Sequence, residues 1–156
     1  MLRYKTIDLK KDERIVTSFR KDSFAISFNE TSGFEKAGYV QWLAGKIKEF
    51  PDGFVMVDEG SDPIGQLELS IREYEGRHIG YVHLYYLKSE YRRRGLGNEI
   101  HQYALQSFRD HDVPEYHLRV SPNNVQAKRF YEKNGMIEIG PEIGDKVVRM
   151  KGEVER

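Results

Sequence analysis

The sequence of 156 residues contains no cysteine and a single tryptophan. Without cysteine, disulfides, thiolate metal sites and a cysteine nucleophile are excluded. Lys plus Arg and Asp plus Glu each number 25, so the formal net charge is zero. A nucleic-acid-binding domain usually has a basic excess, so we expect no nucleic-acid partner. No apolar run reaches membrane length and the N-terminus has no apolar signal core, so we expect a cytoplasmic protein that does not associate with membranes.

A chain of this length fits one domain, which we expect to span residues 1–156. In its first half Asp8 is a plausible N-cap for a helix, and 34–50 has the apolar pattern of a second helix. In the strand expected at 64–71, polar Gln66 and Glu68 alternate with apolar residues, which indicates a half-buried strand. Further strands are expected at 2–7, 54–57 and 79–87.

The stretch from Ile79 to Asp110 holds the strongest functional signal. Its first nine residues are almost continuously apolar, which is typical of a strand buried on both faces. Ile100, Ala104 and Phe108 recur at four-residue steps and predict an amphipathic helix. Between strand and helix lies the glycine turn, Arg92 to Asn98. Glycines let the backbone approach a ligand, and the first amides of a helix carry the positive end of its dipole. Together these elements predict an anion cradle.

The cradle lacks the third glycine of dinucleotide sites and the Gly-Lys-Ser/Thr of nucleotide P-loops. The sequence Arg92-Arg93-Arg94-Gly95-Leu96-Gly97 instead resembles the pyrophosphate motif of the GNAT superfamily, the Gcn5-related N-acetyltransferases. Read alone, the motif could also be a basic loop capped by glycine. A second GNAT signature is matched by residues 124–136, from Asn124 through Ala127 and Tyr131 to Gly135, with Met136 where the family has Phe. The resemblance covers Ile79 to about Met150.

The resemblance implies an α/β (α+β) fold with a mixed, mostly antiparallel central sheet of about six to seven strands. Helices should cover both faces. One parallel β-α-β core should join 79–87 to a strand at 117–120, and these two strands can splay where they end. A helix from 125 to about 134 and a closing hairpin of 136–139 and 146–150 complete the expected order.

The family implies transfer of an acetyl group from acetyl-CoA directly to a primary amine. Backbone amides of the glycine turn would hold the diphosphate, and the strand would pair with pantetheine near a bulge. The cofactor-binding residues implied by the motifs are Tyr85, Tyr86, Leu87, Arg92, Arg93, Arg94, Gly95, Leu96, Gly97, Asn98, Asn124, Ala127 and Tyr131. The histidines show no metal spacing, so no metal is expected.

Three residues are candidates for catalysis: Tyr131, Glu68 and His83. Tyr131 aligns with the family's tyrosine that protonates the CoA thiolate; its alternative role is an aromatic core residue beside Phe130. A hairpin centred near Glu75 would place Glu68 opposite Val82 or His83, near the thioester, where a base is needed. The alternative is that Glu68 faces solvent and His83 is a core histidine.

Other readings remain open at this point. Asn124 could contact pantetheine or simply cap its helix. The same scaffold could be a CoA or acyl-CoA sensor without catalysis. The acceptor, which could be a small molecule or a protein, and the use of other acyl groups are not fixed by the sequence. A homodimer through the sheet edge or the C-terminal hairpin is a further expectation from the family.

Overall fold

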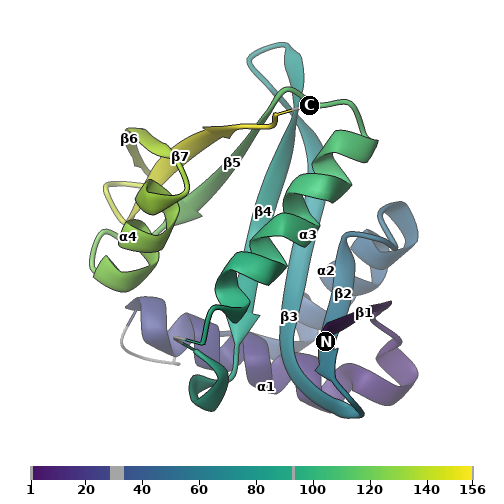
Figure 1. Ribbon diagram of the computed structural model, residues 1–156. Coiled ribbons are helices and arrows are strands. Elements are labelled where there is room, and N and C mark those ends of the chain that lie inside the picture. Colours follow the sequence, from purple (N-terminus) through teal and green to yellow (C-terminus); the bar gives the residue numbers. More distant parts are fainter. Residues whose placement is uncertain (1, 29–33, 93, 156) are drawn as a thin grey trace.

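The structure is a computed structural model that describes residues 2–28, 34–92 and 94–155. Within these residues, seven strands form one sheet in the order β1-β2-β3-β4-β5-β7-β6 (Figure 1). The strands are β1 (Leu2–Thr6), β2 (Phe54–Glu59), β3 (Asp62–Tyr74), β4 (Arg77–Leu87), β5 (Glu115–Val120), β6 (Ile137–Glu142) and β7 (Val147–Glu153). The helices are α1 (Leu9–Phe28), α2 (Lys36–Glu49), α3 (Leu96–Asp110) and α4 (Val125–Lys133). The predicted loop at 29–33 and cradle residue Arg93 lie outside the described residues.

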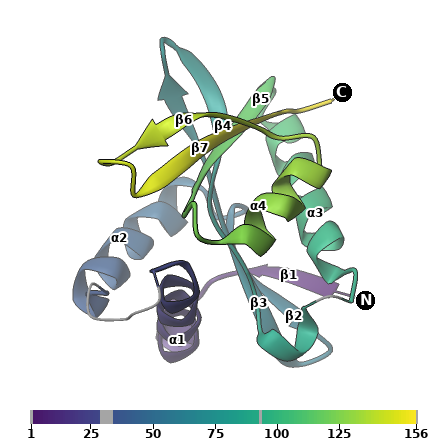
Figure 2. The same ribbon diagram turned by 90° about the vertical axis from the view of Figure 1, so that its left-hand side faces the viewer.

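Helices cover both faces of this sheet, as Figure 2 shows. On one face, Val16 and Phe19 of α1 and Leu43 of α2 pack against Phe54 and other strand residues. On the opposite face, side chains of α3 and α4 pack against apolar residues of the central strands. Among the strands that the structure describes, β4 and β5 alone pair in parallel, and every other neighbouring pair is antiparallel. The predicted fold class is therefore confirmed.

The expected start of α1 is also confirmed. The Asp8 side chain accepts a hydrogen bond of 3.0 Å from the Lys10 amide, and the Asp12 side chain accepts one of 3.0 Å from the Asp8 amide. These carboxylates satisfy donors that the first helical turn would otherwise leave without a partner.

Strand β3 differs from its prediction. It is longer than 64–71, and the prediction of one exposed face is wrong, because Gln66 and Glu68 are both 0% exposed. Alternation of polar and apolar residues usually indicates a solvated face. Here α1 and α2 cover that face and supply Arg20 and Tyr39 as hydrogen-bond partners, so its polar side chains are buried but satisfied.

Helix α3 buries Ile100, Ala104 and Phe108, as the four-residue spacing predicted. Full burial of the two large side chains, Ile100 and Phe108, contributes about 1.5–3 kcal/mol each. The helix begins at Leu96, three residues before the expected start at Glu99. Gly95 has φ of 79°, a left-handed conformation that glycine adopts without strain, and this allows the helix to begin directly at the end of the turn.

Two irregularities of β4 open the sheet. Its parallel pairing with β5 runs only from Gly80 and Tyr116 to Val82 and Leu118, after which the two strands diverge (Figure 1). On the other side, the register with β3 shifts between Glu68 and Leu69, so that His83 is an extra residue in β4. The expected splaying is confirmed. The expected pairing of Glu68 with Val82 or His83 is wrong, because the bulge moves Glu68 opposite Leu84.

The closing hairpin has the predicted order but different bounds. Strands β6 and β7 extend past 136–139 and 146–150, and the turn between them is shorter than expected. Left-handed conformations at Ile143, Gly144 and Asp145 make this tight turn. The hairpin places β7 beside β5 and leaves β6 at the sheet edge.

His101 of α3 gives a prediction about acid stability. The side chain is 2% exposed, lies 3.0 Å from the Tyr85 hydroxyl, and burial lowers its pKa to about 4. In the unfolded chain a histidine titrates near about 6.5, so the unfolded state takes up a proton first as the pH falls. The stabilisation from neutral His101 is therefore present above about pH 6.5 and is lost between that pH and about 4.

Chemical denaturation from pH 7.5 to pH 4.5 checks this. Wild type should lose more unfolding free energy over this range than His101→Gln. The exposed-site variant His78→Gln is the matched control and should follow wild type. Parallel curves for wild type and His101→Gln would contradict the assignment.

Candidate active site

A cleft of about 900 Å³ lies where β4 and β5 diverge. Its walls come mainly from α1, β4, the start of α3, β5 and α4, and Arg72 of β3 and Val147 of β7 also line it. Eleven of the predicted site residues line it: His83, Tyr85, Tyr86, Leu87, Arg92, Gly95, Gly97, Asn98, Asn124, Ala127 and Tyr131. Glu68, Arg94 and Leu96 do not line it. Residues from widely separated motifs therefore share one cleft.

The glycine turn presents backbone to this cleft. Gly95 is the N-cap of α3 and has no side chain to bond the first helical amides. Gly97 faces α4, where an added Cβ would lie 3.3 Å from the Phe130 ring. The amides at the start of α3 have no partner within the helix and carry the positive end of its dipole. This end of the cleft has the properties of an anion site.

Arg92 and Arg94 of the turn make different contacts. Arg92 donates a hydrogen bond of 2.8 Å from Nε to the Leu87 carbonyl, and its Nη2 lies 3.4 Å from Asp22. The side chain therefore braces the turn against the end of β4. Arg94 is exposed, with its guanidinium 5.3 Å from the Tyr91 ring, and Leu96 packs against the core below the turn.

The wall formed by α4 carries the second motif. The Asn124 side chain accepts a hydrogen bond of 3.3 Å from the Ala127 amide, so it caps the helix while it also lines the cleft. The Tyr131 ring lies 6.3 Å from the Tyr85 ring, centre to centre. Burial raises the pKa of Tyr131 to about 12, so this phenol keeps its proton at neutral pH.

At the bulge, His83 lies in an aromatic cage. Its ring is 5.1 Å from Trp42 and 4.8 Å from Tyr81, and a ring nitrogen lies 2.7 Å from the Ser70 hydroxyl. Burial, with smaller contributions from Arg72 and Arg20, lowers the pKa of His83 to about 3. The imidazole is therefore neutral at physiological pH and opens toward the cleft.

Behind His83, Glu68 is fully buried, so the alternative that it faces solvent is wrong. Its carboxylate accepts hydrogen bonds from Arg20 and Tyr39, both of 2.5 Å, and from Gln66 at 2.8 Å. Burial raises the pKa of Glu68, and these three donors oppose the rise. Arg20 also lies 3.4 Å from the His83 carbonyl, so the carboxylate network reaches the bulge through this arginine.

Sequence reasoning missed Arg20 and the hydrogen-bonding role of Tyr39. Both lie on helices whose apolar faces were used only to predict packing. Arg20 follows Val16 by one helical turn and Phe19 by one residue, which puts a charge on the buried face of α1. A charge at such a position requires a buried partner, and that requirement was the available signal.

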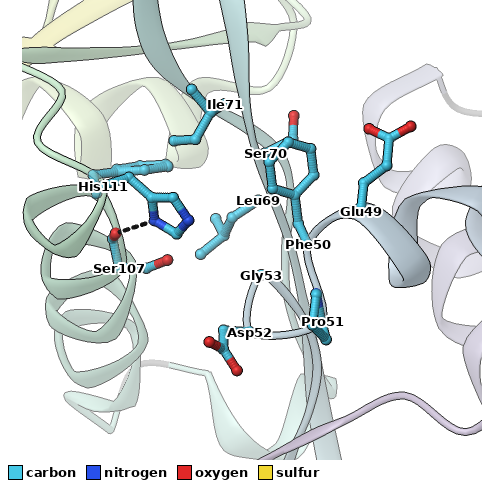
Figure 3. A pocket seen from close by; sticks show the side chains of 11 residues that line it. Glu49, Phe50, Pro51, Asp52, Gly53, Leu69, Ser70, Ile71, Ser107 and His111 are labelled. Atoms are coloured by element: carbon cyan, nitrogen blue, oxygen red, sulfur yellow. Dashed lines mark hydrogen bonds between the residues drawn. The ribbon is translucent and has the colours of Figure 1, made fainter.

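A second cavity, of about 60 Å³, lies away from the cleft (Figure 3). It is bounded by the turn after α2, by β3 and by the end of α3, where a His111 ring nitrogen lies 2.8 Å from the Ser107 carbonyl. The two cavities share no lining residue. A volume of this size holds only a few water molecules, so a larger ligand needs the cleft.

No cluster of three or more histidine, aspartate or glutamate side chains in ranges 2–28, 34–92 and 94–155 could hold a metal ion. Likewise, none of the helices assigned within those ranges has the length and apolar character needed to span a bilayer.

Solved structures with the same fold are numerous. Ard1 from Thermoplasma volcanium superposes with a TM-score of 0.76 at 19% identity, over 99% of each chain. The PaiA N-acetyltransferase from Thermoplasma acidophilum, in complex with coenzyme A, gives 0.74 at 17% identity over 98% of this chain and 99% of that one. YncA from Salmonella typhimurium, a putative acetyltransferase with acetyl-CoA, gives 0.73 at 14% identity over 100% and 95%. At these identities the likeness establishes the fold.

A search of curated proteins finds no match to this chain. The family comparison does find one: residues 14–136 match the Acetyltransferase (GNAT) family. That range includes both motifs, the bulged strand and most of the cleft. The chain therefore belongs to the GNAT family of acetyltransferases.

Proposed function

We propose that this protein transfers the acetyl group of acetyl-CoA directly to a primary amine held in the same cleft. One observation carries the proposal: the glycine turn, the unpaired end of β4 and Tyr131 all face one cleft of about 900 Å³. That volume suits a cofactor-sized ligand. Coenzyme A or acetyl-CoA is present in related structures of the same fold, which supports this choice of ligand.

The amides of Gly95 to Asn98 would hold the diphosphate, with the positive end of the α3 dipole behind them. Beyond Val82, β4 has no β5 backbone beside it, so Tyr85, Tyr86 and Leu87 can pair with the amides of pantetheine. Ala127 and Asn124, whose side-chain oxygen caps α4, lie on the wall of the cleft that faces β4. This chain would thus bind the cofactor mainly through backbone groups.

Binding of acetyl-CoA at the cradle can be measured by thermal unfolding. Acetyl-CoA at about 100 times its Kd should raise the melting temperature of the wild type by roughly 5–10 °C. Gly97→Trp should abolish the shift, because its indole would occupy the space between the turn and Phe130. The matched control is Gly45→Trp on α2, where an added Cβ meets no atom within 4 Å. An unchanged shift in Gly97→Trp would place the cofactor elsewhere.

Tyr131 would donate a proton to the departing CoA thiolate. Its pKa of about 12 keeps the phenol protonated, and its ring lies beside Tyr85 on the cleft wall that α4 forms. A general acid at this position would protonate the sulfur as the C–S bond of the tetrahedral intermediate breaks, so that CoA leaves as the neutral thiol.

Tyr131→Phe tests this role by removing one oxygen. We expect kcat to fall about a hundredfold while the Kd for CoA changes little. Tyr103→Phe, whose hydroxyl bonds the Asp52 carbonyl outside the cleft, is the control and should keep wild-type turnover. Full turnover in Tyr131→Phe would remove Tyr131 from the mechanism.

His83 would take the proton from the acceptor amine and pass it to solvent. It is neutral at the pH of the assay, lies at the bulge and opens to the cleft. Glu68 acts one step behind: through Arg20 it holds the His83 carbonyl, and it has no direct access to the amine. We therefore assign Glu68 a positioning role.

The pH profile tests the role of His83. Because burial lowers its pKa to about 3, log kcat/KM should rise steadily with pH toward the pKa of the amine, without a break near about 6.5. His83→Gln should reduce kcat/KM at least about tenfold, whereas His111→Gln, outside the cleft, should not. A clear histidine break near pH 6.5 in wild type would contradict this assignment.

The competing function is a sensor that binds CoA or its esters without transfer. It is favoured by one observation: His83 has a pKa far below neutrality and Glu68 is enclosed, so the described residues that line the cleft include no histidine or carboxylate tuned to neutral pH. Release of free thiol in the presence of acetyl-CoA and a panel of amines separates the two. Release no faster than hydrolysis for every amine, with tight CoA binding, would favour the sensor.

A further inference from the structure

The cleft has a second end, away from the glycine turn, which we call the acceptor end. It is formed by Arg20 of α1, Arg72 of β3, Tyr81 and His83 of β4, and Arg119 of β5. Three of these five side chains are arginines. Among the cleft-lining residues that the structure describes, none is an aspartate or glutamate.

The charges of these arginines are neutralised to different extents. Arg20 is paired with Glu68. Arg119 and the buried Arg149 share a single carboxylate, Glu142, at 2.8 and 2.9 Å. In the described part of the chain, no carboxylate lies within ion-pair distance of Arg72. The acceptor end therefore carries a surplus of positive charge, although the whole chain is neutral.

The ring of Tyr81 stacks with two of these positively charged side chains. The Arg72 guanidinium lies 4.5 Å from its ring centre, and the Arg149 guanidinium lies 5.7 Å away. Such stacking fixes an arginine while it leaves the edge of the guanidinium free to donate hydrogen bonds. Because Tyr81 precedes His83 by two residues, both side chains lie on one face of β4, and their ring centres are 4.8 Å apart.

An amine that binds beside His83 would therefore share the acceptor end of the cleft with Arg72 and Arg119. Guanidinium groups favour carboxylates and other planar oxyanions, which accept two parallel hydrogen bonds. A polyamine or an aminoglycoside would instead bring further positive charge into a site that is already basic, which is unfavourable.

We propose that the acceptor is a small amine that also carries a carboxylate or comparable anionic group, as an amino acid does, and that Arg72 and Arg119 bind that group. The proposal rests on the proposed acetyl transfer for the identity of the site, but its anion preference is measurable without turnover. Arg72 and Arg119 determine specificity in this scheme and do not touch the reacting atoms.

Calorimetry on protein saturated with CoA tests the anion site directly. The probes are the N-acetyl derivatives of glycine, leucine, phenylalanine and glutamine, each compared with its neutral primary amide, and N-acetylspermidine as the cation. We expect at least one acid to bind at least about tenfold more tightly than its amide, as a charge-assisted pair implies. Arg72→Gln should reduce that preference to about twofold or less, and Arg119→Gln should weaken it.

The matched control is Arg14→Gln, an exposed position on α1 outside the cleft, which should keep the preference. Equal binding of acids and amides, tighter binding of N-acetylspermidine, or no binding of any acid would each overturn the proposal. A preference that survives in both Arg72→Gln and Arg119→Gln would overturn the assignment to these arginines.

Turnover of the corresponding free amines distinguishes failure of the inference from failure of the proposed function. Amino acids should release CoA thiol faster than their amides, although amidation makes the amine less basic and so more available for attack at neutral pH. Acids that bind but are not acetylated would support the anion site and contradict the proposed acetyl transfer. If amides and polyamines were acetylated as fast as the acids, the proposed acetyl transfer would be supported and the anion preference contradicted.

Discussion

The divergence of β4 from β5 is the constraint on which the other features of the site depend. The two strands pair over three residues, from Gly80 to Val82, and then separate. Buried backbone groups without partners are costly, so a strand edge opened in this way needs either water or a ligand beside it. The helix that connects the strands begins at the open end, and its unpaired amides face the same space. One topological feature thus produces both the cleft and the polar groups that line it.

The bulge at His83 determines which side chains of β4 face helices α1 and α2. One extra residue brings His83 and Leu84 onto the face covered by α1 and α2, where a regular strand would place only one of them. The same face of β3 presents polar side chains, and the helices above it supply Arg20 and Tyr39. The buried network around Glu68 therefore stabilises an irregular piece of strand. Its arginine is shared with the cleft, which couples the packing of α1 to the geometry at His83.

The sequence predicted features that depend on interactions between nearby residues and missed features that depend on residues far apart in the chain. Local patterns predicted the amphipathic α3, the buried β4 and the Asp8 cap, and two short motifs predicted the family. The polar face of β3 was predicted to be exposed, because alternation cannot reveal that distant helices cover it. The predicted pairing partner of Glu68 was wrong because the register was counted without the bulge that the family resemblance implied for this strand. The buried partner of Arg20 could not be identified from the sequence, because Glu68 lies 48 residues further along the chain.

The account as a whole depends on backbone groups at the start of α3 and at the end of β4 binding one extended ligand. A crystal structure of the protein with coenzyme A tests this most directly. The account predicts the diphosphate on the amides of Gly95 to Asn98, and pantetheine alongside Tyr85 to Leu87 with its sulfur directed toward Tyr131 and His83. Coenzyme A bound outside the cleft, or in the cleft with its diphosphate away from the glycine turn, would contradict it.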